Sequence, residues 1–311
     1  MIVCRGVTLV RPAGARVVLV GVTFAVRGGE VVALLGSQGS GKSAVVRVLA
    51  GLAVPTGGAA QVCGAAAHTA AGRRHVAYLP AEGWAPPELS AREWLEYVAA
   101  HRGGHPAARL ASVRAALDLA GLHGVAHQRL ITGGRERLQR LALATVAASG
   151  RPVALFDDLE PAGDPAARAV VTDGIALLAQ QGRAVVLASN DVATVERVAT
   201  RVLLLARGHL VADLRMAELL QERVAELTLT GGGLRWVPRL HARYPDAIRT
   251  GEGVAVPLHS GRTLEAVLAS CRAERIPVAG SRLRYRALDD LVLARTLAQG
   301  RPLVDASPGP A

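Results

Sequence analysis

This sequence is poor in lysine, aromatic residues and cysteine, and it has no long apolar run. Of its 36 basic residues only Lys42 is a lysine, and aromatic residues make up 3% of the 311 positions. The long uncharged stretch 51–72 is interrupted by glycine, proline, glutamine and histidine, so we expect no membrane span. Cys4, Cys63 and Cys271 have no metal-ligand spacing and suit a reducing compartment. With no signal peptide at the N-terminus, we expect a cytoplasmic protein.

Apolar residues and arginine are abundant instead. Hydrophobic residues make up 50% of the chain, which is enough for a large core. The length predicts one large α/β domain together with a smaller one. The net charge of +11 is spread along the chain, and no basic run alternates with stacking aromatics. We therefore expect no nucleic-acid partner.

A glycine-rich segment of the form G-x-x-x-x-G-K-S lies between an apolar run and an apolar helix. Such a P-loop holds a polyphosphate through backbone N–H groups and the positive end of the helix that follows. The lysine reaches the terminal phosphates, and the hydroxyl after it binds Mg²⁺. The only lysine of the chain stands at this position, where a slim ammonium is required. The segment reads Gly36, Ser37, Gln38, Gly39, Ser40, Gly41, Lys42 and Ser43.

A pair of carboxylates, Asp157 and Asp158, ends a second apolar run. Parallel strands buried on both faces appear as continuous apolar runs, and α/β sheets bind ligands at the carboxyl ends of their strands. Asp157 is therefore the expected Mg²⁺ partner of Ser43, which gives a nucleotide and Mg²⁺ as the expected ligands.

The pattern of apolar residues predicts an α/β domain over residues 1–220 with a helical insertion at about 88–149. Ser90 is the predicted N-cap of the first helix of this insertion. Strands are expected at 2–10, 16–26, 31–35, 74–79, 153–158 and 184–188, helices at 165–181 and 192–199, and a closing hairpin around 207–209. Residues 221–311 predict a second domain in the order strand, helix, hairpin, helix, strand, helix, which is typical of a small α+β ferredoxin-like fold.

The order of motifs resembles the ATP-binding subunit of ABC transporters over about residues 1–215. The second domain resembles the C-terminal extension of exporter subunits of the ABC-2 type. The matching segments are Gly36–Ser43 (Walker A), Tyr78-Leu79-Pro80 (before the Q-loop), Thr132-Gly133-Gly134 (signature), Leu155–Asp158 (Walker B), Gly163-Asp164-Pro165 (D-loop), Asn190 (switch) and 202–213 (closing hairpin).

This resemblance implies a P-loop NTPase of the ABC cassette type. It implies ATP and Mg²⁺ as ligands, with Thr132, Gly133 and Gly134 contacting the nucleotide of a second nucleotide-binding subunit, in a homodimer or a heterodimer. It also implies a separate ABC permease as membrane partner and a peripheral location at the inner face of the membrane. The expected function is therefore the ATP-binding subunit of a bacterial exporter.

Several positions depart from the family pattern. Ala81 replaces the glutamine that contacts Mg²⁺ and water, and Asn190 replaces the switch histidine and cannot carry a positive charge. Asp158 replaces a glutamate base and is one methylene shorter. The signature has two alignments: one gives it two extra residues before Gln139, and the other puts Gly-Gly-Arg-Glu-Arg in place of Leu-Ser-Gly-Gly-Gln. Asp158 and Asn190 remain the candidate catalytic residues of an impaired ATPase.

Two alternative functions belong to other classes. A catalytically impaired pseudo-ATPase would use ATP as a structural or regulatory ligand and would share every binding residue. An ABC-type protein acting on nucleic acid or ribosomes usually carries two cassettes or long coiled-coil insertions, and neither is predicted here. The ATPase rate distinguishes the first alternative from an active transporter subunit.

Overall fold

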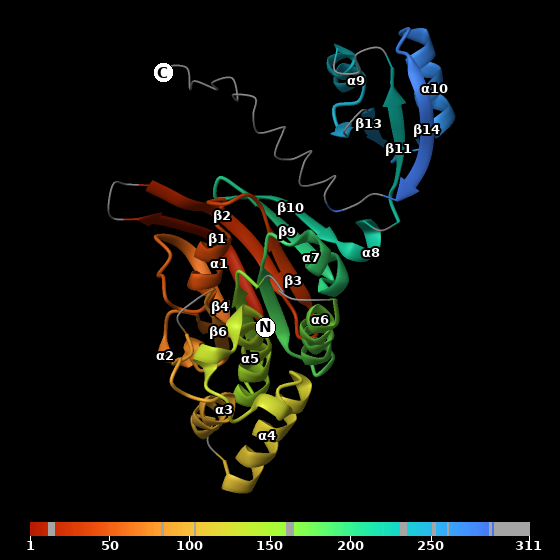
Figure 1. Ribbon diagram of the computed structural model, residues 1–311. Coiled ribbons are helices and arrows are strands. Elements are labelled where there is room, and N and C mark those ends of the chain that lie inside the picture. Colours follow the sequence, from red (N-terminus) through yellow and green to blue (C-terminus); the bar gives the residue numbers. More distant parts are fainter. Residues whose placement is uncertain are drawn as a thin grey trace, which may run out of the picture. The chain divides into compact units, whose positions relative to one another are not determined.

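The computed structural model describes residues 1–11, 16–81, 84–102, 104–159, 165–219, 221–230, 235–250, 253–259, 261–285 and 288. The chain divides into two compact units, Met1–Leu214 and Arg215–Ala311 (Figure 1). Among the described residues, no helix combines the length and the apolarity needed to span a membrane. The predicted D-loop residues Gly163 and Asp164, and the helix predicted after residue 288, lie outside the described residues.

A six-stranded sheet forms the centre of the first unit. Its strands lie in the order β10 (His209–Arg215), β9 (Arg201–Ala206), β3 (Val31–Leu35), β8 (Ala184–Ala188), β7 (Val153–Asp157) and β6 (Val76–Leu79). The pairs from β9 to β6 are parallel. Every residue of β3, β7 and β8 is buried, as their continuous apolar sequences predict. The carboxyl ends of β3, β6, β7 and β8 therefore meet at one edge of the sheet.

A smaller antiparallel sheet lies in the same unit, with strand order β2 (Arg16–Val26), β1 (Ile2–Arg11), β4 (Gly57–Val62) and β5 (Ala65–Ala66). Helix α1 (Lys42–Leu49) buries Val45, Val46, Val48 and Leu49 in a core shared with both sheets. The short helix α2 is Ala70–Arg73. The core therefore fixes the helix that follows the P-loop.

Helices α3 (Ala91–Ala100), α4 (Pro106–Leu119) and α5 (Gly134–Ser149) lie in the predicted helical insertion. Two 3-10 turns, His123–Val125 and Leu130–Thr132, separate α4 from α5. Ser90 and Glu93 form the reciprocal capping box that fixes the start of α3. Together with α6 (Pro165–Gln180), these helices share an apolar core with the six-stranded sheet, and α7 (Val192–Val198) packs beside α6.

The second unit contains a four-stranded antiparallel sheet in the order β12, β13, β11, β14. This is the strand order of a split βαβ fold, as the sequence predicts. Apolar residues of β11, α9, β13 and α10 form a separate core for this unit. The elements are α8 (Met216–Leu219), β11 (Arg223–Leu229), α9 (Val237–Arg243), β12 (Ile248–Thr250), β13 (Gly253–Pro257), α10 (Leu264–Ala273) and β14 (Val278–Tyr285).

Candidate nucleotide site

The strand ends of the first unit surround a cleft of about 1010 Å³. The P-loop follows β3, Asp157 ends β7, and Asn190 follows β8 after one intervening residue. Because these strands are parallel neighbours, segments far apart in the sequence meet in this cleft. Of the residues expected to act together, those that line it are Gln38, Gly39, Gly41, Lys42, Ser43, Asp157, Asp158 and Asn190.

The P-loop requires glycine at two positions for steric reasons. Gly36 has a φ of 147°, and a Cβ there would lie 2.1 Å from the carbonyl oxygen of Leu205. Gly41 is the N-cap of α1 with a φ of 112°, and a Cβ there would lie 2.8 Å from Cδ2 of Leu19. The loop therefore lies against β2 and β9 more closely than a side chain would permit.

The Lys42 side chain is folded over the P-loop. Its ammonium nitrogen donates to the carbonyl oxygens of Gly36 at 2.7 Å and Ser37 at 3.1 Å. Lys42 is only 9% exposed, while Ser43, the next residue of α1, is half-buried at the cleft. The positive charge is therefore held where oxygens of a bound polyphosphate would replace the two carbonyls.

Asp157 has the burial and the chemistry of a metal-binding carboxylate. It is 6% exposed, and its Oδ1 has no hydrogen-bond partner among the described residues. Its Oδ2 accepts from the Tyr78 hydroxyl at 3.4 Å. Burial, and then the charge of Asp157, raise the pKa of Tyr78, so this hydroxyl remains a proton donor. An unpartnered carboxylate oxygen and the Ser43 hydroxyl in one cleft fit the oxygen ligands that Mg²⁺ prefers.

The three positions that depart from the family pattern line the same cleft. Asp158 is half-buried and has a φ of 63°, a left-handed conformation that aspartate adopts more readily than most residues. Ala81 and Asn190 are both exposed. Only one charged group, the Asp158 carboxylate, is thus present among these three.

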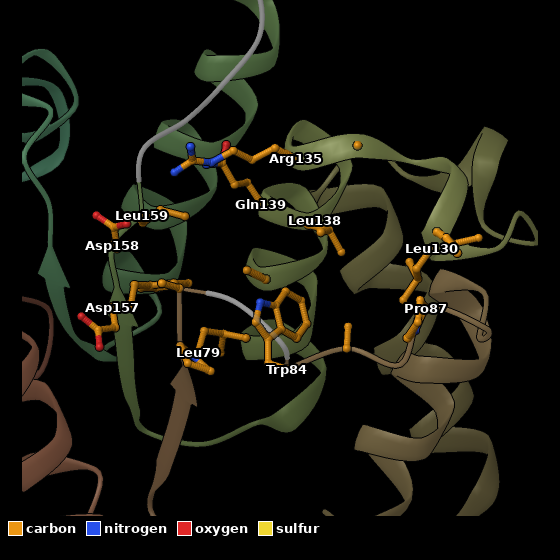
Figure 2. A pocket seen from close by; sticks show the side chains of 17 residues that line it. Leu79, Trp84, Pro87, Leu130, Arg135, Leu138, Gln139, Asp157, Asp158 and Leu159 are labelled. Atoms are coloured by element: carbon orange, nitrogen blue, oxygen red, sulfur yellow. The ribbon is translucent and has the colours of Figure 1, made fainter.

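An adjoining pocket of about 450 Å³ shares Pro80, Ala81, Asp157 and Asp158 with the nucleotide cleft. Figure 2 shows the two aspartates on one side of this pocket, while Trp84 and Leu138 lie farther across it. The pocket therefore connects the end of β7 with helix α5.

Thr132 ends the 3-10 turn before α5, Gly133 is the N-cap of α5 and Gly134 is its first residue; none of the three lines the nucleotide cleft. The Thr132 hydroxyl donates to the carbonyl oxygen of Arg129 at 2.8 Å and accepts from Arg137 at 3.4 Å. A Cβ at Gly133 would lie 2.4 Å from Cδ of Arg137, so the arginine side chain covers this glycine. Sequence reasoning missed this role of Arg137.

Two arginines that sequence reasoning missed also line the cleft. Arg47 projects from α1, and Arg207 is in the turn between β9 and β10. The backbone of Gly208 donates to the carbonyl oxygen of Ser40 at 2.9 Å and accepts from the Val20 amide at 2.9 Å. These bonds attach the turn to the P-loop and to β2, so Arg207 is held at the rim of the cleft.

The family model described as "ABC transporter" matches residues 19–161. An ABC transporter ATP-binding protein of Streptomyces avermitilis is 35% identical over 195 residues, which cover 61% of this chain and 34% of that protein. A Nod factor export ATP-binding protein I of Rhizobium sp. strain N33 is 26% identical over 294 residues, which cover 91% of this chain and 93% of that protein. The chain thus spans about a third to three fifths of the length of the first curated relatives it matches.

Solved structures of ABC transporter cassettes have the same fold. The dimeric structure of MJ0796, a bacterial ABC transporter cassette, has a TM-score of 0.63 and 22% identity, and the match covers 70% of this chain and 99% of that one. Another solved ATP-binding subunit of an ABC transporter has a TM-score of 0.63 and 24% identity, covering 70% of this chain. The family match over residues 19–161 and these relatives show that the first unit of the chain contains an ABC transporter ATP-binding domain, and the solved structures show its cassette fold.

Proposed function

We propose that this chain is the ATP-binding subunit of a bacterial ABC exporter and couples Mg-ATP binding, with slow hydrolysis, to transport by a separate membrane subunit. The observation that carries the proposal is the meeting of Lys42, Ser43 and Asp157 in one cleft at the carboxyl ends of parallel strands. The long alignment with a Nod factor export protein, which includes the second unit, supports export as the direction.

The residues of the cleft have distinct roles in binding ATP. The backbone amides of the P-loop and the start of α1 would bind the phosphates, and Lys42 would exchange its two carbonyl partners for phosphate oxygens. Ser43 and Asp157 would hold Mg²⁺, which neutralises phosphate charge when bound. The Tyr78 hydroxyl orients the Asp157 carboxylate by donating to its Oδ2.

Hydrolysis is expected to be slow because the groups that act on water and on the γ-phosphate are weakened. Among the described residues that line the cleft, Asp158 is the carboxylate left to act as a base if Asp157 holds Mg²⁺, and Ala81 offers no side-chain ligand. Asn190 can donate only a neutral hydrogen bond. Removing one transition-state contact of this kind typically lowers the rate about 10² to 10³ fold, and such losses are not additive.

The partners proposed are a second nucleotide-binding subunit and a permease. The signature residues Thr132 to Gly134 lie away from the cleft of their own chain, which suits contact with a nucleotide bound by another subunit. Ile131 beside them is 71% exposed, an unusual position for a large apolar side chain. MJ0796, which has the same fold, is dimeric.

The ATPase rate of the purified chain tests this proposal. We expect turnover below the ordinary enzyme range of about 1 to 10 per second. A variant combining Ala81→Gln, Asp158→Glu and Asn190→His should hydrolyse faster if the signature closes on the nucleotide. Lys42→Ala is the control, because any rate that it retains comes from a contaminant.

A pseudo-ATPase is the second candidate, favoured by the loss of side-chain function at Ala81 and Asn190. Adding the membrane partner separates the two candidates: a transporter subunit should be stimulated, and a regulatory ATP-binding protein should not. Wild-type turnover in the ordinary range would contradict the slow-hydrolysis proposal and leave the transporter assignment intact.

A further inference from the structure

A further concave site, the basic pocket, lies at the edge of the six-stranded sheet opposite the nucleotide cleft. It has a volume of about 530 Å³ and shares no lining residue with that cleft. His75 and Pro152 in its lining directly precede β6 and β7, whereas the nucleotide cleft lies at the carboxyl ends of those strands. The ends of α3 and α5 complete the wall.

The lining of the basic pocket carries positive charge and no carboxylate. Its basic side chains are Arg74, His75, His101, Arg102 and Arg151. In the described part of the chain, none of these five forms an ion pair with an acidic side chain. Arginines elsewhere do pair, for example with carboxylate oxygens at 2.5 Å and 2.8 Å. An unpaired cluster of this kind is a potential anion site.

Contacts with the protein hold these charges in place. Arg151 donates to the carbonyl oxygens of Arg73, at 3.2 Å, and of Arg74. The Nε of Arg74 donates to Nε2 of His75 at 3.2 Å. The Arg102 side chain covers Gly150, where a Cβ would lie 2.5 Å from its Nε. The guanidinium groups are therefore partly preorganised, which lowers the entropic cost of binding a ligand.

The helix ends beside the pocket do not balance this charge. Each helix C-terminus carries about half a negative charge, so α3 and α5 together supply about one against three guanidinium groups. Arg183 already donates to the carbonyl oxygen of Val146, in the last turn of α5, at 2.6 Å. Burial lowers the pKa of Arg183, and the charge of Arg102 lowers it further, which indicates repulsion across this region.

We propose that the basic pocket binds a phosphate group, carried by a soluble phosphate compound or by an anionic phospholipid headgroup. Guanidinium groups present paired N–H donors that match two phosphate oxygens, which gives both charge neutralisation and orientation. Tyr97 is 57% exposed and adds an aromatic wall, with its ring centroid 4.5 Å from that of His101. The site is independent of the nucleotide cleft and of the reaction there.

Two probes distinguish the sources of phosphate. Inorganic pyrophosphate is titrated in a thermal-shift assay, and vesicles of phosphatidylglycerol with phosphatidylcholine are used in a flotation assay against phosphatidylcholine alone. Both use the full chain carrying Lys42→Ala, which weakens competing binding at the P-loop. The test variant adds Arg74→Gln and Arg102→Gln, and the matched control adds Arg5→Gln and Arg114→Gln, two exposed arginines outside the pocket.

Whichever probe the Lys42→Ala parent binds, we expect the test variant to bind it at least about tenfold more weakly. The control variant should bind that probe as tightly as the Lys42→Ala parent. Binding of pyrophosphate alone assigns a soluble ligand, and binding of anionic vesicles alone assigns a lipid headgroup. If the test variant unfolds, the single change Arg74→Glu at an exposed side chain replaces it. Failure of both probes, or equal loss in the test variant and the control, would overturn the proposal.

Discussion

The Lys42 ammonium nitrogen lies 2.7 Å from the carbonyl oxygen of Gly36, at the other end of the same loop. A carbonyl oxygen of the P-loop thus accepts the hydrogen bond that a phosphate oxygen of bound ATP would accept instead. This relationship keeps a desolvated lysine satisfied, since an unpaired buried ammonium would be costly. When ATP binds, Lys42 would therefore replace hydrogen bonds to backbone carbonyls with hydrogen bonds to phosphate, so its number of hydrogen bonds need not rise.

Replacing Lys42 with alanine should remove most of the affinity for ATP. A ligand at 100 times its dissociation constant stabilises the folded state by about 2.7 kcal/mol if it binds that state alone. In a thermal-shift titration with Mg-ATP, wild type should gain this stabilisation and Lys42→Ala should gain little. Arg5→Ala is the control, because that exposed arginine lies outside the cleft. Equal stabilisation of wild type and Lys42→Ala would contradict the assignment.

Arg207 should strengthen nucleotide binding in a salt-dependent way. It lies at the cleft in an exposed turn attached to the P-loop, and its charge attracts phosphates through solvent. We expect Arg207→Ala to weaken ATP binding about threefold to tenfold at low salt and less at high salt, measured by calorimetry. Arg114→Ala, on α4 outside the cleft, is the matched control. A loss identical at both salt concentrations would argue against this electrostatic role.

We propose that the domain boundary predicted between residues 220 and 221 separates two folding units. The structural division falls between Leu214 and Arg215, and each unit has its own apolar core. A chain ending at residue 220 should therefore remain folded, unfold cooperatively and bind ATP with affinity close to that of the full chain. Circular dichroism and the thermal-shift titration measure this. A fragment that is unfolded would mean that the second unit completes the core of the first.

The second unit should lose stability in acid partly through Glu226. This carboxylate accepts from Arg282 at 2.7 Å and from Arg284 at 3.1 Å, across the β11–β14 pair. The Arg282 hydrogen bond, followed by the charges of both arginines, lowers the pKa of Glu226 below its ordinary value of 4.5. A lowered pKa in the folded state contributes stability above the unfolded value, and that stability is lost as pH falls through the folded value.

We therefore expect the Tm of wild type to fall more steeply below about pH 4.5 than that of Glu226→Gln. The two proteins are compared by calorimetry at neutral pH and at successively lower pH. Glu265→Gln, an exposed change on α10, is the control. Parallel curves for wild type and Glu226→Gln would show that the arginine pairing contributes no pH-dependent stability.

Much of the fold could be predicted because each central strand is a continuous run of apolar residues. The predicted strands at 31–35 and 184–188 agree with β3 and β8 at both ends. Strand β4 was missed because its sequence, Gly-Gly-Ala-Ala-Gln-Val, has low strand propensity. It is held instead by pairing with β1 more than fifty residues earlier, for example between Ile2 and Val62, and no local pattern reveals such a contact.

The nucleotide site was predictable to the extent that strand ends determine it. Lys42, Asp157 and Asn190 each follow or end an apolar strand, so parallel pairing was enough to bring them to one cleft. The Arg137 side chain over Gly133 was not predictable, because it depends on the path of a long side chain across a helix turn. The position of Arg207 depends on backbone hydrogen bonds between segments far apart in the sequence, and a local sequence pattern does not predict such bonds.

The order of strands in the central sheet also bears on how the chain folds during synthesis. In β3, Val31 pairs with Val185, about 150 residues further along the chain. At roughly 5 to 20 residues per second, the ribosome needs roughly 8 to 30 s to supply that neighbour. The β1–β2 hairpin joins adjacent segments and can form within about 10 μs. The strand that precedes the P-loop is thus among the first parts of this unit to be made and among the last to be paired, and its apolar surface remains exposed to aggregation or to a chaperone in the meantime.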